Sequence, residues 1–289
     1  MNFILKCSSC TVCVVYGREG YHALFLKPLA RLLGCVYAEL DYMSLYRAYR
    51  RGNPGLYYIE DVWFRGGVAP DPRRPVPRAL EPLRGKMYPV LGNVQVFYTD
   101  GRWGTASEAP CGRVGLLAKA GEPLVTDLFL PLYLETRDVA KALALAKEFY
   151  KCGLPSTPSE LVQGIRSGRY AAAYLWLGWA PDLRLRPNPA LGRAVAGFWG
   201  LTAIGVEVQL PDFYAYPPPY LDAQWRPYEH NKRLVESAIA VRGPGWMDYV
   251  EMAYPVIEAF LNGAVGVDKA ARALGERLRE ALHEGEGLF

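Results

Sequence analysis

Strands and helices alternate over the first hundred residues, and this pattern constrains the fold more than any other feature of the sequence. Residues 11–16 read T-V-C-V-V-Y, a β-branched and aromatic run typical of a buried strand, which ends at Gly17. An amphipathic helical segment follows, and then a strand over 35–42, a short helix over 43–53 and a strand over 55–64. Strands joined by helices form right-handed crossovers in a parallel sheet, so the sequence predicts an α/β fold.

The rest of the chain continues with mixed strand and helix signals. Strands are expected over 170–179 and 198–210. Thr136 is expected to cap the helix that follows it, and residues 157–160 (T-P-S-E) have the sequence of a capping box. Apolar residues at helical spacing over 267–282 predict a C-terminal helix that packs on a core.

Composition excludes several classes of partner. The 33 basic and 29 acidic residues give a net charge of only +4, and no basic tract stands out, so we expect no nucleic-acid binding. No stretch approaches the ~20 apolar residues needed to span a bilayer, so the chain as given is not expected to be membrane-spanning. Asn and Gln are sparse while Arg, Pro and Tyr are abundant, a bias that fits a thermophile.

Three cysteines, Cys7, Cys10 and Cys13, have C-x-x-C-x-x-C spacing. An iron–sulfur or zinc site would need a fourth ligand, and no matching cysteine or histidine arm accompanies them. We therefore expect no metal and no cofactor. The favoured interpretation is that Cys13 is a core residue of the first strand, with Cys7 and Cys10 at its start. A disulfide, for instance to Cys35, is the main alternative, and pairing among the six cysteines stays open.

Motifs for common enzyme chemistry are absent from the sequence. Residues 17–20 (G-R-E-G) follow the first strand, where a phosphate-binding loop would lie, but they lack G-x-G-x-x-G and the Gly-Lys-Ser/Thr of a P-loop. No G-x-S-x-G or H-E-x-x-H motif occurs. Glu60 and Asp61 form a candidate acid–base pair, although adjacent strand residues point to opposite faces. We expect that the chain is not an enzyme.

Aromatic residues instead gather at the ends of the expected elements. Trp63 ends the third strand, and other tryptophans follow glycine turns or end the strand over 170–179. Ligands bind at the carboxyl ends of strands in parallel sheets, and aromatic faces suit the flat apolar faces of sugars. The alternative for each tryptophan is a place in the hydrophobic core.

The order of these segments resembles the extracytoplasmic solute-binding proteins of ABC importers, a family that includes sugar binders. Residues 11–34 look like the first strand and helix of that family. Residues 85–100 are similar to its segment that ends in a tyrosine where the chain crosses between lobes, and residues 164–179 to its second-lobe strand that ends in Gly and Trp. Residues 243–282 resemble its C-terminal helices.

The resemblance implies an α/β, two-lobed, periplasmic-binding-protein-like clamshell, in which each lobe is a mainly parallel sheet flanked by helices. The first lobe is expected to combine residues 1–98 with 204–241. The second is expected to combine 99–203 with 242–289, which includes the C-terminal helices.

The ligand-binding residues expected from the strand ends and from the resemblance come from both lobes. Tyr98 matches the family's crossing tyrosine, and Trp179, or Trp176 if the register differs, matches the tryptophan that faces the ligand. The full expected set is Glu19, Tyr21, Tyr42, Asp61, Trp63, Tyr98, Trp103, Trp176, Trp179 and Trp246.

The function that the resemblance implies is binding of a small solute, a sugar or similar, in an interlobe cleft, and delivery of that solute to an ABC import permease. The protein is then expected to be a monomer. It would be extracytoplasmic (cell-surface) if an upstream leader has been removed or missed, and cytoplasmic otherwise. Two alternatives stay open: a cytosolic ligand sensor with the same fold, and a small α/β enzyme that uses Glu60 or Asp61.

Overall fold

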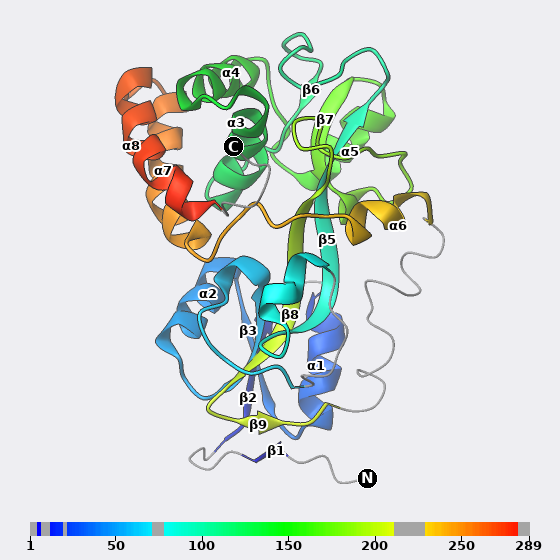
Figure 1. Cartoon of the computed structure of the whole chain (residues 1–289), viewed down its shortest axis with the longest axis vertical. Helices are drawn as coiled ribbons and strands as arrows, with labels where there is room; N and C mark the ends of the chain where they lie inside the picture. Colours follow the sequence, from blue (N-terminus) through cyan, green and yellow to red (C-terminus); the bar gives the residue numbers. More distant parts are fainter. Residues whose placement is uncertain (1–4, 7–11, 20–21, 71–77, 211–228, 283–289) are drawn as a thin grey trace. The chain divides into compact units, whose positions relative to one another are not determined.

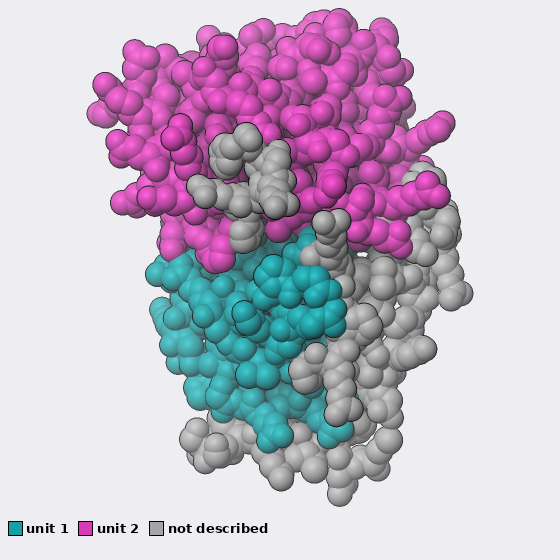
Figure 2. Space-filling model, in the orientation of Figure 1, with its two compact units in different colours: residues 1–92, 197–227 teal, residues 93–196, 228–289 magenta. Residues whose placement is uncertain are grey.

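A computed structural model describes residues 5–6, 12–19, 22–70, 78–210 and 229–282 of the chain. The chain divides into two units, each built from segments that are distant in the sequence. Unit 1 comprises residues 1–92 and 197–227, and unit 2 comprises residues 93–196 and 228–289 (Figure 2). The lobe boundaries that the sequence predicts, near residues 98, 204 and 241, stay a prediction.

Unit 1 has the alternating pattern that the sequence predicts. Its elements are β2 (Val14–Arg18), α1 (Ala23–Leu32), β3 (Val36–Leu40), α2 (Tyr42–Arg51) and β4 (Gly55–Glu60). The strand β2 pairs in parallel with both β3 and β4, so the order is β3-β2-β4. Because the two crossovers run in opposite directions, right-handed connections place α1 and α2 on opposite faces of these strands (Figure 1).

The helix α2 begins and ends at residues whose chemistry fixes its bounds. The Asp41 side chain caps the first turn by accepting a hydrogen bond from the Ser44 amide at 3.0 Å. Gly52 ends the helix in the left-handed conformation, with φ of 69°, which costs glycine least. These caps place Tyr42, in the first turn, beside the carboxyl end of the sheet.

Two long strands carry the chain from one unit to the other. The strand β5 (Tyr88–Thr99) leaves unit 1, and β8 (Val195–Ile204) returns to it and pairs antiparallel with β4. In unit 2, β7 (Ala172–Trp176) pairs antiparallel with β5 and parallel with β6 (Val114–Gly115). The seven strands have the order β3-β2-β4-β8-β5-β7-β6. A separate pair joins β1 (Leu5–Lys6) to β9 (Glu207–Val208).

Unit 2 is rich in helices. A π-helical segment, η4 (Leu124–Phe129), continues into α3 (Leu130–Thr136); both pack on α4, η4 also packs on α7, and α8 packs on α4 and α7 (Figure 1). The remaining bounds are α4 (Val139–Lys151), α5 (Pro158–Arg166), α6 (Glu229–Glu236), α7 (Trp246–Leu261) and α8 (Val267–Ala281). The capping box that begins α5 and the C-terminal helix are confirmed.

The predicted cap of α4 is wrong. Asp138 caps this helix by accepting a hydrogen bond from the Lys141 amide at 3.0 Å. Thr136 instead ends α3, and its hydroxyl donates to the carbonyl oxygen of Leu132 at 2.8 Å. Thr136 and Asp138 are both of a residue type that caps helices, but Thr136 is the last residue of α3, so Asp138 caps α4.

Two short 3₁₀ helices shift the expected ends of strands. The strand β4 ends at Glu60, and η2 (Asp61–Trp63) follows it; likewise β7 ends at Trp176, before η5 (Leu177–Trp179). Another 3₁₀ helix, η3 (Arg78–Leu83), precedes β5. Trp63 and Trp179 therefore lie one helical turn beyond the strand ends.

Cys13 and Cys35 form a disulfide at the starts of β2 and β3. The favoured expectation, which left Cys13 as an unpaired core residue, is therefore wrong, and the disulfide alternative is confirmed. The cause is the parallel register of the strands: Val14 lies opposite Val36, so the two preceding cysteines are neighbours. Cys7 and Cys10 lie outside the described residues.

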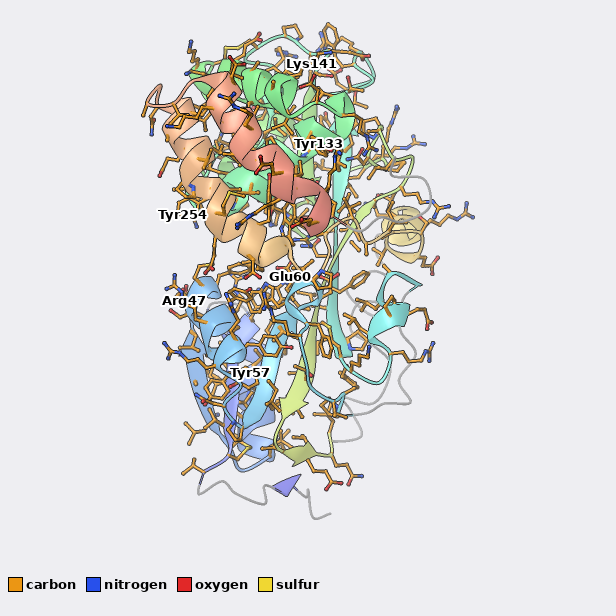
Figure 3. The ribbon with its side chains drawn as sticks, turned by 60° about the vertical axis from the view of Figure 1, so that its left-hand side comes forward. Arg47, Tyr57, Glu60, Tyr133, Lys141 and Tyr254 are labelled. Carbon is orange, nitrogen blue, oxygen red and sulfur yellow. A yellow bond between two sulfur atoms is a disulfide. The ribbon has the colours of Figure 1, made fainter. Side chains whose placement is uncertain are left out.

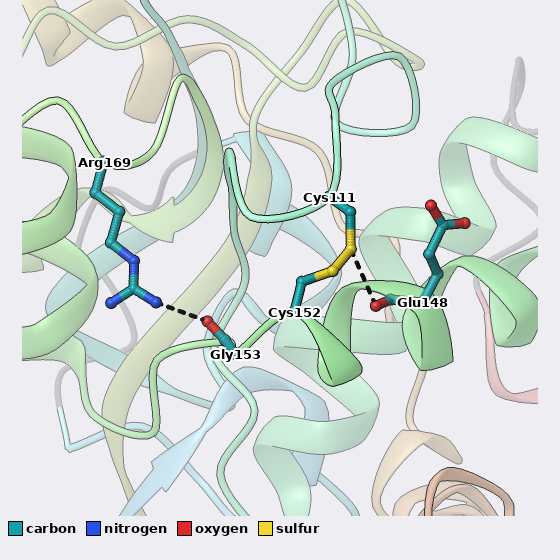
Figure 4. The surroundings of a disulfide bond; sticks show 5 residues. All are labelled: Cys111, Glu148, Cys152, Gly153 and Arg169. Carbon is teal, nitrogen blue, oxygen red and sulfur yellow. Dashed lines mark hydrogen bonds between the residues drawn. A yellow bond between two sulfur atoms is a disulfide. The ribbon is translucent and has the colours of Figure 1, made fainter.

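A second disulfide joins Cys111, before β6, to Cys152 at the end of α4 (Figure 4). The Cys111 Sγ atom lies 3.3 Å from the carbonyl oxygen of Glu148 in the last turns of that helix. Arg169 donates to the neighbouring carbonyl oxygen of Gly153 at 3.1 Å. This bridge fixes the long loop after β5 to the helical part of unit 2.

The described residues contain neither a metal-binding group nor a membrane-spanning helix. No group of three or more His, Cys, Asp or Glu side chains there has an arrangement that could hold a metal ion. Across the same ranges, no helix combines the length and the hydropathy that crossing a membrane requires.

Candidate ligand-binding site

The carboxyl ends of β2 and β4 bring polar and aromatic side chains together in unit 1. Arg18 is the last residue of β2, Glu60 the last residue of β4, and Tyr42 lies in the first turn of α2. His22 precedes α1 at the same end of the sheet. This end of a parallel sheet is where ligands bind in open α/β folds.

A set of packed rings lies at this place, and we call it the unit 1 aromatic cluster. It consists of Tyr42, Tyr58, Trp63 and Trp199. The Tyr58 and Trp199 rings stack with centroids 4.9 Å apart. Trp63 lies edge-on to both Tyr42 and Trp199, at 4.9 Å and 5.2 Å. These separations are within the range in which aromatic pairs attract one another.

Hydrogen bonds fix the polar edge of this cluster. The Tyr42 hydroxyl donates to Glu60 Oε2 at 2.7 Å and accepts from Trp63 Nε1 at 3.4 Å. Figure 3 shows Glu60 at the carboxyl end of β4, beyond Tyr57 in the middle of that strand. Tyr42 thus connects the carboxylate at the strand end to the buried indole.

The Arg18 guanidinium lies over two rings of the cluster. Its central carbon is 5.2 Å from the ring centroids of both Tyr42 and Trp199, which is cation–π geometry. The Arg18 carbonyl oxygen accepts a hydrogen bond from the Tyr37 hydroxyl at 2.6 Å, which holds the end of β2. A positive charge is therefore held against aromatic faces.

His22 adds a neutral polar group to the same place. Its Nδ1 atom is 3.1 Å from the Tyr58 hydroxyl, and the side chain is buried. Burial, and then the nearby charge of Arg18, lower the pKa of His22 to about 3. The imidazole is therefore uncharged at neutral pH.

In unit 2 a different set of side chains surrounds a buried acid, and we call it the Asp127 cluster. It consists of Gln95, Asp127, Trp176 and Arg242. Asp127 Oδ1 accepts from Trp176 Nε1 at 2.7 Å and from Gln95 Nε2 at 3.4 Å. The Arg242 guanidinium lies 5.3 Å from the Trp176 ring centroid and donates to the carbonyl oxygen of Ala196 at 3.0 Å.

Asp127 is in an environment that disfavours its charged form. Burial, and then the charge of Glu122, raise the pKa of Asp127 well above its usual value. The hydrogen bonds from Trp176 and Gln95 and the charge of Arg242 oppose that change. The balance favours a neutral carboxyl that holds the Trp176 indole in one orientation.

Some predicted site residues lie in or next to the unit 1 aromatic cluster, some lie in or next to the Asp127 cluster, and the rest lie elsewhere. Tyr42 and Trp63 belong to the unit 1 aromatic cluster, and Asp61 lies beside it, where its Oδ1 atom accepts from the Phe198 amide at 3.2 Å. In unit 2, Trp176 belongs to the Asp127 cluster. Trp246 is fully buried next to that cluster, and its Nε1 atom donates to Thr126 Oγ1 at 3.3 Å.

The remaining predicted residues lie outside these two clusters. Glu19 is exposed after β2, and Tyr98 is half-buried in β5. Trp103 is half-buried in the loop after β5, and Trp179 is half-buried at the end of η5. Tyr21 lies outside the described residues.

The sequence prediction missed several members of the two clusters, and two residues next to the unit 1 aromatic cluster. The missed members are Tyr58, Trp199, Gln95, Asp127 and Arg242, and the two neighbours are Arg18 and His22. Two signals in the sequence could have found some of them. Arg18 ends the first strand, where ligands bind in this class of fold. Asp127 is the one acid in the apolar run L-V-T-D-L-F, which indicates a buried carboxyl that needs partners.

A hollow of about 420 Å³ lies elsewhere, on the helical part of unit 2. The residues that line it are Cys111, Ala144, Lys147, Glu148, Lys151, Cys152, Phe260 and Val267. None of them belongs to either cluster, and Lys147 crosses it to donate to the carbonyl oxygen of Phe260 at 2.9 Å. We therefore place the candidate site at the clusters, where aromatic faces and polar groups converge.

Comparison with solved structures shows which fold this is. The maltose-bound MalE3 of T. maritima matches with a TM-score of 0.66 at 12% identity, over 93% of this chain and 99% of that one. A solute-binding protein of an ABC transporter from Agrobacterium vitis, with bound D-mannitol, matches with a TM-score of 0.56 at 13% identity, over 93% and 97%. The chain has the two-lobed α/β fold of these binding proteins, as the sequence predicts.

A third structure gives the same result. The GacH receptor of Streptomyces glaucescens, studied unliganded and with acarbose, matches with a TM-score of 0.57 at 12% identity, over 95% of this chain and 99% of that one. No protein-family model matches the chain, and no curated protein matches its sequence. The likeness therefore lies in the fold.

Proposed function

We propose that this protein binds a small solute, a sugar or similar, and delivers it to an ABC import permease. The observation that carries the proposal is the unit 1 aromatic cluster, which lies at the carboxyl ends of β2 and β4. Flat aromatic faces bordered by a few polar groups are the usual composition of a carbohydrate site. The bound solutes in the similar structures, maltose, acarbose and D-mannitol, are carbohydrates or polyols.

The proposed contacts in unit 1 are Tyr42, from the sequence prediction, together with Trp199 and Glu60; Trp63, also predicted, is fully buried and supports these rings from behind. Rings supply the apolar contact, while the Glu60 carboxylate and the Tyr42 hydroxyl supply acceptors and donors for solute hydroxyls. In unit 2 the proposed contacts are Trp176 and Trp179, both half-buried. Glu19, Tyr21, Asp61, Tyr98, Trp103 and Trp246 remain proposals of the sequence prediction.

The proposal includes no catalysed reaction. Glu60 and Asp61, the acids that an enzyme would use, have different partners: Glu60 accepts from Tyr42, and Asp61 accepts from the Phe198 amide. The similar structure from Agrobacterium vitis is described as a solute-binding protein. A role as a binding protein therefore accounts for both acids as groups that position their neighbours.

An extracytoplasmic place of action is part of the proposal. Two disulfides lie in the described residues, but intracellular proteins of heat-adapted organisms carry disulfides too, so the support for this place is the extracytoplasmic family that the sequence resembles. We propose that the monomer carries its solute there.

A thermal-shift screen tests the proposal. Maltose, maltotriose, acarbose, D-mannitol, acidic sugars, oligopeptides and inorganic oxyanions are each added at a large excess. A ligand at about 100 times its Kd stabilises the folded state by ~2.7 kcal/mol, which raises Tm by several degrees. We expect a carbohydrate or polyol to give that shift and to be recovered unchanged. A shift with peptides alone, no shift at all, or conversion of the solute would contradict the proposal.

A further inference from the structure

Arg18 differs from the surface arginines of this protein. Arg84, Arg102 and Arg166 form ion pairs with exposed or partly exposed carboxylates. Arg18 is half-buried, and among the described residues it forms no ion pair. Its charge is held by aromatic rings instead.

One hydrogen-bond donor of Arg18 is also without a partner among the described residues. Its Nε atom is buried and has no hydrogen-bond partner among the described residues. Buried donors in native proteins are almost always paired, so an unpaired one needs an explanation, such as an acceptor that arrives with a ligand. The place of Arg18, at the carboxyl end of a parallel strand and inside a candidate ligand site, favours that explanation.

Neighbouring groups leave this charge available. Glu60 accepts the hydroxyl of Tyr42, and His22 is neutral and directs Nδ1 toward the Tyr58 hydroxyl. The Tyr42 and Trp199 rings that flank the guanidinium restrict its orientation without neutralising it. An oriented guanidinium binds planar or tetrahedral oxyanions through two parallel hydrogen bonds.

We propose that Arg18 binds an anionic group of the solute, so that the protein is specific for acidic sugars that carry a carboxylate or a phosphate. This inference rests on the proposed function and deepens it, because it names the substrate class of the same site. The rings of the unit 1 aromatic cluster contact the apolar face of the sugar, and Arg18 contacts its charged group.

Calorimetric titration with paired probes tests this inference. The probes are D-glucose, D-glucuronate and D-glucose 6-phosphate, together with maltose and its oxidised form, maltobionate. We expect at least one acidic probe to bind tenfold or more tightly than its neutral counterpart at low ionic strength. The preference is expected to weaken as salt is added, because salt screens charge interactions. Comparing glucuronate with the phosphate ester distinguishes the two anionic groups.

Two variants of Arg18 test its role. Arg18→Gln is expected to weaken binding of the acidic probe at least tenfold while leaving binding of the neutral probe within twofold. Arg18→Lys keeps the charge but loses the planar fork, so we expect an intermediate loss. Melting temperatures establish that each variant is folded.

Arg169→Gln is the matched control. Arg169 also lies over a ring, 5.1 Å from the Tyr170 centroid, but it is exposed in unit 2 and away from both clusters. We expect this variant to bind every probe like the wild type.

The outcomes separate the inference from the function on which it rests. Tight binding of neutral probes with no acidic preference overturns the inference and leaves the proposed function standing. An acidic preference that survives Arg18→Gln also overturns the inference. If no carbohydrate, neutral or acidic, binds the wild type, the proposed function is wrong and the inference fails with it.

Discussion

The unit 1 aromatic cluster and the Asp127 cluster contain similar side chains that have different roles. In each cluster an arginine lies over a tryptophan ring. In each, a carboxyl group also accepts a hydrogen bond from an aromatic side chain. In unit 1 the arginine lacks an acidic partner among the described residues, and the acid lies at the end of a strand. In unit 2 the acid is fully buried within a π-helical segment and receives two donors.

The difference indicates which cluster recognises a ligand and which one supports it. Half-buried groups, such as the Tyr42 ring and the Arg18 guanidinium, expose surface that a solute can contact. A buried neutral carboxyl that receives hydrogen bonds from Trp176 and Gln95 instead fixes the orientation of the tryptophan. We therefore expect the two clusters to differ in what depends on them: ligand affinity falls with changes in unit 1, and the pH dependence of stability changes with Asp127.

The largest loss of stability is expected for Trp63→Ala, which tests whether this tryptophan of the unit 1 aromatic cluster is a core residue. Trp63 is completely buried against Tyr42, Tyr46 and Trp199, and loss of such a side chain costs about 3–5 kcal/mol of unfolding free energy. Urea unfolding measures it. Trp103→Ala, at a half-buried loop position, is the control and should cost clearly less. Equal losses would show that Trp63 is not a core residue of the cluster.

The two disulfides should make comparable contributions to stability, although they close loops in different units. Their sequence separations are 22 and 41 residues, and each should stabilise by about 3–4 kcal/mol through the unfolded state. Cys35→Ser and Cys111→Ser remove one bridge each, and melting temperatures with and without reductant measure the loss. A wild-type Tm that is insensitive to full reduction would contradict both pairings.

Asp127→Asn tests the protonation of the buried carboxyl. A raised pKa means that the folded state binds the proton more tightly than the unfolded state does. The resulting stability is fully present below about pH 4 and is lost as pH rises toward the folded pKa, by ~1.4 kcal/mol per unit of pKa difference. The variant should lack this decline between pH 4 and pH 8 in urea unfolding. Asp182→Asn, at an exposed ion pair, should leave the slope unchanged.

The smallest effect is expected for Tyr42→Phe. This change removes the hydroxyl that donates to Glu60 and accepts from Trp63, which should cost about 1 kcal/mol or slightly more. Glu60→Gln in the Tyr42→Phe background should then cost less than it does alone, because the two side chains interact. Strict additivity in the double-mutant cycle would show that the Tyr42–Glu60 bond contributes nothing to stability.

Much of the fold could be predicted from local patterns. The alternation up to Glu60, the capping box at Thr157 and the apolar spacing of α8 are all determined by neighbours in the sequence. The π-helical segment at Leu124–Phe129 could not be predicted, because its apolar run has no clear period and its one acid is stabilised by distant residues. The Cys13–Cys35 disulfide likewise depends on the register of β2 and β3.

The candidate site was predictable only in part. Trp63 and Trp176 stand out because they lie in or at the end of strand-like runs, and Tyr42 because it ends the strand-like run over 35–42. The sequence does not show which rings meet, since Trp199 reaches Tyr58 only through antiparallel pairing of β4 with β8. Arg18 carries no motif, and its place becomes informative only when its partners are known.

The central claim is that a carbohydrate or polyol binds at the unit 1 aromatic cluster. Calorimetric titration of the solute that raises Tm most, into the wild type and into Trp199→Ala, tests it most directly. We predict one site per chain in the wild type, recovery of the solute unchanged, and an affinity at least tenfold lower in the folded fraction of the variant, as truncation of an aromatic anchor commonly costs ~2 kcal/mol or more. Equal affinity in the two proteins would contradict the claim.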